Sequence, residues 1–456
     1  HVLTNGSTMT SMLFRIIALS ICARWVQADP NIAFVSTLTS ESYTLPAKVL
    51  GYALRQLHPH IPYVIVVTED ISNETVNELR NHNIDVQRTE KIDTPYLEDH
   101  RATKFQYTKI RLWAMTAYTS LVHLDLDVLP LRPIDALFKC GSFCAAIRHS
   151  DMMNSGVFVF KPSMEVFSDM LDKAGLHNYS SYDGGDQGFL NTYFPQTKRG
   201  PMFIENDTNP PCSFPYRPLS AAYNYDIGMY YLNGGRALID PAIIHYTMGP
   251  VKPWRWWTYP LIDINHHWLR ARTDMERAYN ERRSPDYDLA WTIGVAALFL
   301  TVAYKIVHIY VGEMLLVERG MLRGIESLLC PPLLVALSII TAFHAVPEHT
   351  RPATAWSYAL AVMELSLIFV GLLYASLRRG RRASGMIAFK FMCMSIGVII
   401  AVPMAFLLVT SFNYRIVWLL VAGHVAFCTL VFLTSRVLIG DGDFARTKYE
   451  LVPNKI

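Results

Sequence analysis

The stretch Leu121-Val122-His123-Leu124-Asp125-Leu126-Asp127 decides the fold class. A short apolar run, typical of a buried strand, ends here in two aspartates at alternate positions. Outward from it, strand-like runs at 33–35 and 63–67 alternate with helical patterns at 45–57 and 105–118. This alternation predicts an α/β fold with a largely parallel sheet, helices on both faces and ligands bound at the carboxyl ends of the strands.

The two aspartates after this strand have two interpretations. Carboxylates at alternate positions can lean to one side of a strand end, where their hard oxygen atoms suit Mn²⁺ or Mg²⁺ bridging a diphosphate. Paired acids also commonly cap turns or face water. Because unpaired carboxylates at the end of a buried strand are costly, we expect a cation or strong hydrogen-bond donors beside Asp125 and Asp127. The sequence contains no Gly-rich fingerprint of the dinucleotide or P-loop type, which argues against a dehydrogenase or a kinase.

The composition indicates that one part of the chain lies in water and another in a lipid bilayer. Of the 456 residues, 51% are apolar and 17% charged, whereas soluble domains carry about 25% charged residues. The formal net charge of +3 excludes a broad electrostatic footprint for nucleic acid. After residue 288 come five apolar stretches, each close to the roughly 20 residues of a membrane-spanning helix. They are 289–311, 325–346, 353–376, 386–410 and 414–439.

These patterns predict a domain organisation. We expect a signal peptide or signal anchor at 1–28, a lumenal domain at 29–260, an interfacial connector at 261–288, an all-α domain of five transmembrane helices at 289–440 and a cytosolic tail at 441–456. The arginine cluster within 378–382 then lies in the cytosol, which agrees with the positive-inside rule. Three cysteines fall in the lumenal domain, where one disulfide can form and one thiol is left over. They are Cys140, Cys144 and Cys212.

Aromatic and basic side chains gather around the connector. The tryptophans within it and just before it are Trp254, Trp256, Trp257 and Trp268, and arginines follow them. Tryptophan favours the bilayer interface and arginine favours anionic headgroups. We therefore expect this segment to lie near the membrane surface and to form part of an acceptor platform, with packing inside a domain core as the alternative.

A set of motifs resembles glycosyltransferase family 8, the glycogenin-like group. The set begins with the Asp125-Leu126-Asp127 motif, continues with blocks at 154–159 (NSGVFV) and 183–188 (DGGDQG), and ends with His245 and the block at 251–254 (VKPW). The resemblance covers nearly the whole expected lumenal domain. It implies a GT-A-type nucleotide-sugar-binding domain with a Rossmann-like mixed sheet, a UDP-sugar donor, Mn²⁺ or Mg²⁺ as cofactor, and retention at the anomeric carbon.

The resemblance also implies roles for single residues. Asp125, Asp127 and His245 would hold the metal, and Lys252 would contact the donor phosphates, where positive charge stabilises the leaving diphosphate. Asp186 and Gln187 match positions that face the donor sugar and are, with Lys252, the expected catalytic residues. The other expected donor-binding residues are Tyr43, which would stack on uracil, together with Lys109, Asn154, Ser155 and Gly249.

Other interpretations of these residues remain. One fewer residue separates His245 from Lys252 than in the family, so Gly249-Pro250 leaves the role of Lys252 open. Apart from the resemblance, the two glycines at 184–185 would be a turn and Asp186 a helix N-cap. A single histidine such as His245 is usually satisfied by ordinary hydrogen bonds.

The acceptor is inferred from the membrane segments. A lumenal catalytic domain with a polytopic tail resembles the membrane-bound plant inositol phosphorylceramide glucuronosyltransferases, which implies transfer of glucuronic acid to a membrane lipid in the Golgi or endoplasmic reticulum. Lys109 or Arg111 would be the cation near C6 of glucuronate. The alternatives are a glycogenin-like or other family 8 glucosyl or galactosyl transferase with a protein or glycan acceptor, Tyr231 included, and a non-catalytic sugar-binding polytopic membrane protein.

Overall fold

A computed structural model describes the chain at residues 31–96, 105–147, 152–205, 214–249, 251–258 and 262–281, and at single positions and two short runs between 337 and 366. The chain divides into two compact units. The first comprises His1–Lys252 with Trp268–Asn280, and the second comprises Pro253–His267 with Glu281–Ile456. Each unit is described below by itself.

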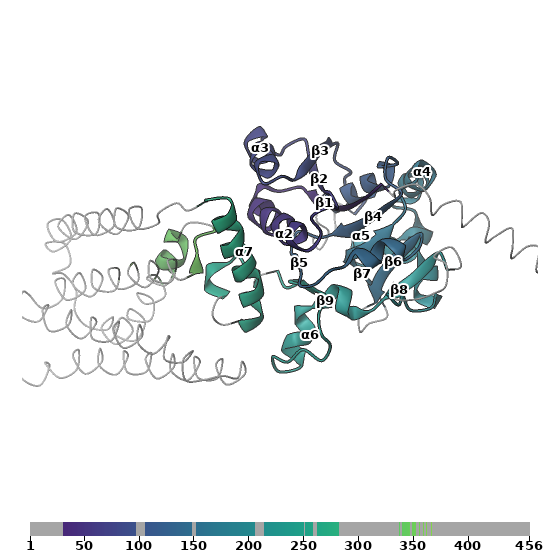
Figure 1. The fold of residues 1–456 in the computed structure, drawn as a ribbon. Helices are drawn as coiled ribbons and strands as arrows, with labels where there is room; N and C mark the ends of the chain where they lie inside the picture. Colours follow the sequence, from purple (N-terminus) through teal and green to yellow (C-terminus); the bar gives the residue numbers. More distant parts are fainter. Residues whose placement is uncertain are drawn as a thin grey trace, which may run out of the picture. The chain divides into compact units, whose positions relative to one another are not determined.

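The first unit is built on a seven-stranded sheet of order β3-β2-β1-β4-β7-β6-β8 (Figure 1). The strands are β1 (Ile32–Leu38), β2 (Tyr63–Thr68), β3 (Asp85–Thr89), β4 (Ser120–Leu124), β6 (Phe143–Ile147), β7 (Met153–Phe160) and β8 (Tyr216–Leu219). β1 is parallel to β2 and β4, whereas β7 is antiparallel to both β4 and β6. The predicted α/β class is confirmed, as is the mixed sheet that the family resemblance implies. Most neighbouring strands are parallel, as the alternation of strands and helices predicts, and β7 alone runs against both of its neighbours.

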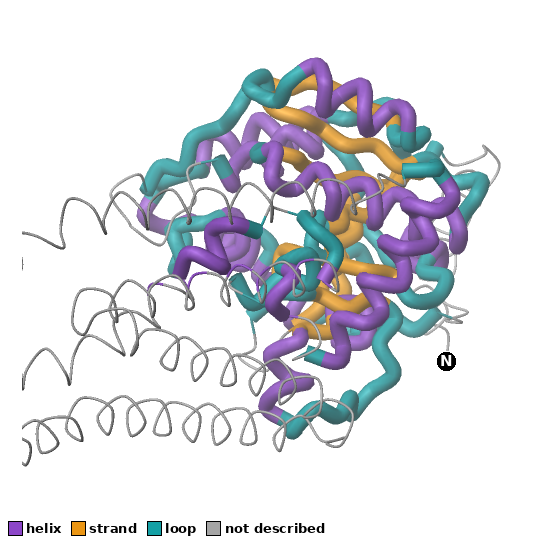
Figure 2. Tube along the Cα trace, turned by 90° about the vertical axis from the view of Figure 1, so that its left-hand side faces the viewer, coloured by secondary structure: helices purple, strands orange, loops and turns teal. Residues whose placement is uncertain are grey.

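Two layers of helices cover this sheet, as the tube view shows with orange strands between purple helices (Figure 2). Between residues 44 and 278 the α-helices are α2 (Thr44–Leu57), α3 (Asn73–Asn81), α4 (Met164–Lys173), α5 (Asp186–Tyr193), α6 (Ile227–Leu232) and α7 (His266–Ala278). Short 3₁₀ turns lie between them: η1 (Glu41–Tyr43), η2 (Gln106–Ala114), η3 (Asp135–Lys139), η4 (His177–Tyr179), η5 (Pro195–Arg199), η7 (Ala221–Asn224), η8 (Trp256–Thr258) and η9 (Asp263–Asn265).

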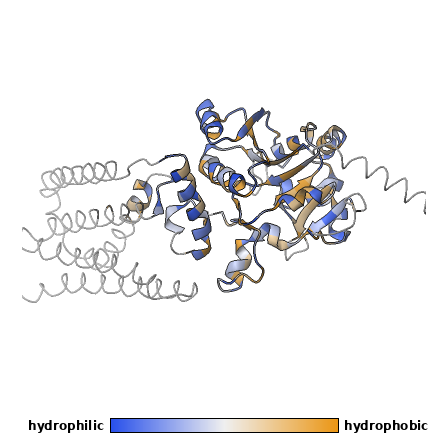
Figure 3. Ribbon diagram, viewed as in Figure 1, coloured by the Kyte–Doolittle hydropathy of each residue, from blue (hydrophilic) through white to orange (hydrophobic). Residues whose placement is uncertain are grey.

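The hydrophobic core has two halves, one on each face of the sheet. Leu50 of α2, Leu79 of α3 and Leu137 of η3 pack against one face. Trp113 of η2 and Phe189 of α5 belong to the half on the opposite face. In Figure 3 the strands are orange over much of their length, whereas α7 is largely blue. The predicted helices on both faces are therefore confirmed, and the carboxyl ends of β1 and β4 stay open between the two layers.

The predicted helix at 105–118 is wrong in type and length. The segment is the 3₁₀ helix η2, which ends at Ala114. Tyr107, Ile110 and Trp113 are each at most 1% exposed. Residues three apart eclipse one another in a 3₁₀ helix, so this winding places all three on the face that meets the core.

A small second sheet, of order β5-β10-β9, brings distant segments together. β5 (Val128–Pro130) starts directly after the two aspartates, and β10 (Ile243–His245) pairs with it so that His245 lies opposite Val128. The backbone N–H of Tyr246 donates to the carbonyl of Asp127 at 2.9 Å. β9 (Tyr225–Asp226) is parallel to β10 on its other side.

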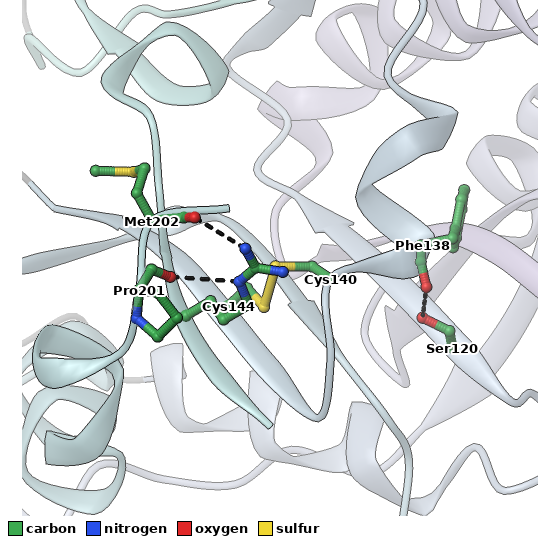
Figure 4. Close-up of a disulfide and its surroundings, with 7 residues drawn as sticks. Ser120, Phe138, Cys140, Cys144, Pro201 and Met202 are labelled. Atoms are coloured by element: carbon green, nitrogen blue, oxygen red, sulfur yellow. Dashed lines mark hydrogen bonds between the residues drawn. A yellow bond between two sulfur atoms is a disulfide. The ribbon is translucent and has the colours of Figure 1, made fainter. Parts of the chain in front are cut away.

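One disulfide joins Cys140, at the end of η3, to Cys144 on β6 (Figure 4). This is the single pair that the cysteine count allows, and Cys212 lies outside the described residues. Opposite Cys144 on β8, the buried Arg217 donates to the carbonyl oxygens of Pro201 and Met202, at 3.3 and 2.9 Å. The bridge and the arginine together fix the edge of the sheet at β6 and β8.

Among the described residues no helix is both long enough and apolar enough to cross a bilayer. The predicted signal segment and nearly all of the five predicted spans lie outside the described residues. In the second unit Trp256 is 7% exposed and packs with Ala342, Val346 and Phe343. Trp254 and Trp268 are also buried, so for these three tryptophans the expected surface platform is wrong, because packing hides their rings.

Candidate active site

A cleft of about 500 Å³ opens in the first unit at the carboxyl ends of β1 and β4. Thr37 and Thr39 line it from the end of β1, and Asp125 and Asp127 line it from the residues after β4. Its volume lies within the range of about 300 to 1,000 Å³ for small-molecule sites. Strand ends of an open α/β sheet are also where such folds bind ligands. The cleft is therefore the candidate active site.

Two aspartates and a histidine converge in this cleft. One ligand atom of each of Asp125, Asp127 and His245 lies within 4.8 Å of the other two. His245 Nε2 is 3.3 Å from Asp127 Oδ1. The pairing of β5 with β10 explains the approach, because it sets His245 opposite the residue that follows Asp127. Sequence spacing alone could not show that residues so far apart meet.

The His245 ring is held in one orientation. Its Nδ1 is 2.7 Å from Asn224 Oδ1, and both side chains are buried. The Cε1 and Nδ1 atoms of the ring lie against Gly156, where a Cβ atom would stand 2.1 Å from His245 Cε1. The glycine of the Asn154-Ser155-Gly156 block is thus required by the close approach of the ring. Nδ1 donates to the amide oxygen, so the Nε2 lone pair remains for a metal ion.

These residues fit a divalent cation. Two carboxylates and one imidazole nitrogen form a hard to borderline donor set, which suits Mn²⁺ or Mg²⁺. The hydrogen bond on Nδ1 gives His245 the tautomer that a metal ligand needs. Asp125, Asp127 and His245 are therefore the residues that would hold the ion.

Lys252 lies beside this group. Its Nζ donates to Asp127 Oδ2 and to the carbonyl of Tyr246, both at 2.6 Å. The structure thus brings Lys252 to Asp127 despite the shortened loop. Gly249 does not line the described cleft, and a Cβ atom on it would meet open space.

Lys109 bridges the two aspartate motifs. Its Nζ is 3.1 Å from Asp125 Oδ1 and 2.7 Å from Asp186 Oδ2. Burial lowers the pKa of Lys109, but attraction to the two carboxylates outweighs it and holds the pKa above its ordinary value. Arg111 turns the other way and pairs with Glu90 at 2.9 Å. Of the two proposed C6 cations, Lys109 alone lines the described cleft.

The pKa values of the two aspartates after β4 are shifted in opposite directions. Burial raises the pKa of Asp125, and repulsion from Asp127 adds to this while Lys109 opposes it. Burial also acts to raise the pKa of Asp127, but His245 and Lys252 outweigh it and hold the pKa well below its ordinary range. Asp127 is therefore the firmly ionised member of the pair.

The start of α5 corrects the N-cap interpretation of Asp186. Gly185 is the N-cap residue, and Asp186 is the first residue of the helix. Asp183 supplies the capping carboxylate, because its Oδ1 accepts from the N–H groups of Gly185 and Gly188, each at 3.0 Å. Gly184 has φ +70°, which favours glycine. The Asp186 carboxylate is thus released from capping and reaches Lys109.

Side-chain amides connect the sugar-facing candidates. Asn154 Nδ2 donates to Gln187 Oε1 at 2.9 Å, and Ser155 N–H donates to the same oxygen at 3.3 Å. Gln187 Nε2 then donates to Tyr182 Oη at 2.6 Å. Tyr43, half-buried at the N-terminus of α2, lines the same cleft.

Several residues of the site were missed from the sequence. Thr37, Thr39, Gln106 and Thr247 line the cleft without any motif that singled them out. Asp183 lies inside the quoted DGGDQG block but was given no role, and Asn224 was given none either. Tyr231, noted as an alternative acceptor, does not line the described cleft.

Comparison with known proteins gives three groups of findings. No family model matches the chain. It is 33% identical over 276 residues to inositol phosphorylceramide glucuronosyltransferase 1 of Arabidopsis thaliana, covering 58% of this chain and 50% of that protein. It is 31% identical to glycogenin-1 of Mus musculus, covering 49% of this chain and 66% of that protein. The chain thus spans half the length of the Arabidopsis relative.

Among solved structures, the apo form of the glycosyltransferase GlyE of Streptococcus pneumoniae TIGR4 matches with a TM-score of 0.40 and 18% identity, over 55% of this chain and 62% of that one. The galactosyltransferase LgtC, in complex with donor and acceptor sugar analogs, matches with a TM-score of 0.38 and 14% identity, over 54% of this chain and 99% of that one.

Proposed function

We propose a function from the premise that the chain resembles the glycogenin-like glycosyltransferases of family 8, a resemblance that its similarity to glycogenin-1 and to a plant glucuronosyltransferase confirms. The proposed activity is retaining, metal-dependent transfer of a sugar from a UDP-sugar. The observation that carries it is the convergence of Asp125, Asp127 and His245 in a cleft that Lys109 and Asp186 also enter.

The positions of the side chains suit this chemistry. A divalent cation, when bound, supplies positive charge to the departing diphosphate. Lys252, next to Asp127, can place a second positive charge on the phosphates as the glycosidic bond breaks. Tyr43 offers a ring surface to the base.

The sugar is proposed to occupy the other half of the cleft. Asn154, Gln187 and Asp186 lie there with hydrogen-bonding groups for its hydroxyls. Lys109 holds Asp186 in place and adds a positive charge. The carboxylate of Asp186 is engaged by this lysine, so we expect it to orient the sugar, while the acceptor attacks from the face that the diphosphate leaves.

We propose glucuronic acid as the favoured sugar and a membrane lipid such as inositol phosphorylceramide as the acceptor. The support is the similarity to a plant protein named for that reaction. The same similarity favours a Golgi or endoplasmic reticulum enzyme with a lumenal catalytic domain at 29–260 and membrane spans within 289–440. The Cys140–Cys144 disulfide fits an oxidising compartment.

The experiment uses the full chain in detergent. UDP release from UDP-glucuronate, UDP-glucose and UDP-galactose is measured with and without Mn²⁺, for the parent and for Asp125→Asn and Asp127→Asn. We expect turnover that needs Mn²⁺ and is lost in both variants. Asp172→Asn, on the exposed surface of α4, is the matched control and retains activity. If both variants fold and match the parent, the assignment is wrong.

Lipid mass spectrometry of cells with and without the protein tests the acceptor. A sugar-bearing sphingolipid that disappears with the protein supports the lipid. If only a protein or glycan product disappears, the lipid acceptor is refuted while the transferase assignment stands.

A further inference from the structure

A buried asparagine outside the cleft contacts the histidine that faces the two aspartates. Asn224 is 5% exposed and is not among the residues that line the cleft. Its Oδ1 lies 2.7 Å from His245 Nδ1, and its Nδ2 lies 2.8 Å from Asn154 Oδ1. One side chain therefore touches both the histidine at the aspartates and an amide of the sugar-facing group.

Backbone donors fix the direction of these hydrogen bonds. The N–H of Gly156 donates to Asn154 Oδ1 at 2.9 Å, and a backbone N–H can only donate. The atom that Asn224 presents to Asn154 Oδ1 must then be its NH₂ group. Its oxygen consequently faces His245, which must carry a proton on Nδ1.

The same logic extends to the sugar side. The N–H of Ser155 donates to Gln187 Oε1, so that oxygen is the acceptor for Asn154 Nδ2. A single set of amide orientations satisfies every hydrogen bond in the series that runs from His245 through Asn224 and Asn154 to Gln187. Strand pairing explains why Asn224 lies close to His245, because β9 follows Asn224 directly and sets Asp226 opposite His245 on β10.

We propose that Asn224 is a positioning residue that sets the His245 tautomer for metal binding and links it to the amides expected to face the donor sugar. This rests on the proposed function. Asn224 acts through His245 and Asn154, because it does not itself line the cleft. Outer partners of metal-bound histidines typically contribute about 10- to 100-fold to metal affinity.

Two variants separate the two contacts. Asn224→Leu removes both, and we expect Mn²⁺ affinity to fall by about 10- to 100-fold, with a raised KM for UDP-sugar. Asn224→Asp keeps an acceptor for His245 Nδ1 but cannot donate to Asn154 Oδ1. Here we expect Mn²⁺ affinity to be retained while the KM for UDP-sugar still rises.

Mn²⁺ affinity is measured on the full chain by electron paramagnetic resonance of the free ion, and kinetics are measured separately. Asn233→Leu at the end of α6, whose side chain bonds only its own helix backbone at Met229, is the matched control with unchanged affinity. Unchanged Mn²⁺ affinity in folded Asn224→Leu overturns the proposal, as does equal loss of affinity in both variants.

If Asn224→Leu does not fold, the Asn224→Asp variant decides alone. Retained Mn²⁺ affinity with a raised KM supports the proposal, and any other combination refutes it. A parent chain that binds Mn²⁺ and turns over UDP-sugar while these variants behave like it rejects the role of Asn224 only. A parent that binds no Mn²⁺ rejects the proposed function itself.

Discussion

Replacing Gly156 by alanine should damage metal binding from a residue that is not a ligand. An added Cβ would lie 2.1 Å from His245 Cε1 and 2.6 Å from Nδ1, whereas ordinary contact begins at 3.4 Å. The ring must therefore retreat by about 1.3 Å, the difference between 3.4 and 2.1 Å. Metal–ligand distances tolerate only about 0.2 Å. The same Cβ would stand 2.9 Å from Asn154 Oδ1, so the side chain of Asn154 would be displaced as well.

We expect Gly156→Ala to lower Mn²⁺ affinity by at least about 10-fold, the effect of disturbing a ligand's support. Electron paramagnetic resonance of free Mn²⁺ measures this, with circular dichroism to check the fold. Gly51→Ala is the control, because its Cβ would press 2.7 Å from the mobile end of Ile84 in the core, away from the cleft. A folded Gly156→Ala chain with the parent's Mn²⁺ affinity would refute the reasoning.

Three further outcomes are expected. Asp183→Ala should cost about 1 kcal/mol of stability, seen in thermal unfolding, because the cap of α5 is lost, and should raise the KM for donor. Arg217→Met should lower the free energy of unfolding by about 2 kcal/mol, seen as a lower denaturation midpoint, because the carbonyl of Met202 loses a charged donor, and should leave Mn²⁺ affinity unchanged. Burial lowers the pKa of His58, whose Nε2 accepts a hydrogen bond from Ile134 N–H. Neutral His58 therefore stabilises the fold above the pKa of the unfolded chain, about 6.5. This stabilisation is lost as the pH falls from that value through the lower pKa of the folded state. Thermal unfolding against pH should show a shallower acid decline in His58→Gln, and an unchanged decline would contradict this.

The sequence predicted those parts of the fold that depend on local pattern. The strands before Asp125 and around Val64 have continuous apolar runs, and their type was right. A mixed sheet was expected from the family resemblance alone. The local pattern did not show that β7 is the antiparallel strand, because the pairing of two strands depends on contacts far along the chain. The 3₁₀ winding of η2 was missed as well, since it follows from how Trp113 packs in the core.

The candidate site divides in the same way. The motif residues from Tyr43 to Lys252 were named through the family resemblance, and most of them meet in or beside one cleft. Arg111 and Gly249 are the exceptions, since neither lines the described cleft. Asn224 escaped notice because its value lies in hydrogen bonds to residues that are distant in sequence, and no spacing rule reports those.

The antiparallel register of β4 and β7 sets Leu124 opposite Val157 and limits which insertions these strands can accept. Side chains alternate between the two faces of a strand, so one codon inserted near the middle of β7 would turn Asn154 and Gly156 away from His245. Length variation among relatives should therefore accumulate in the loops around α3 and η5 and be absent from these two central strands.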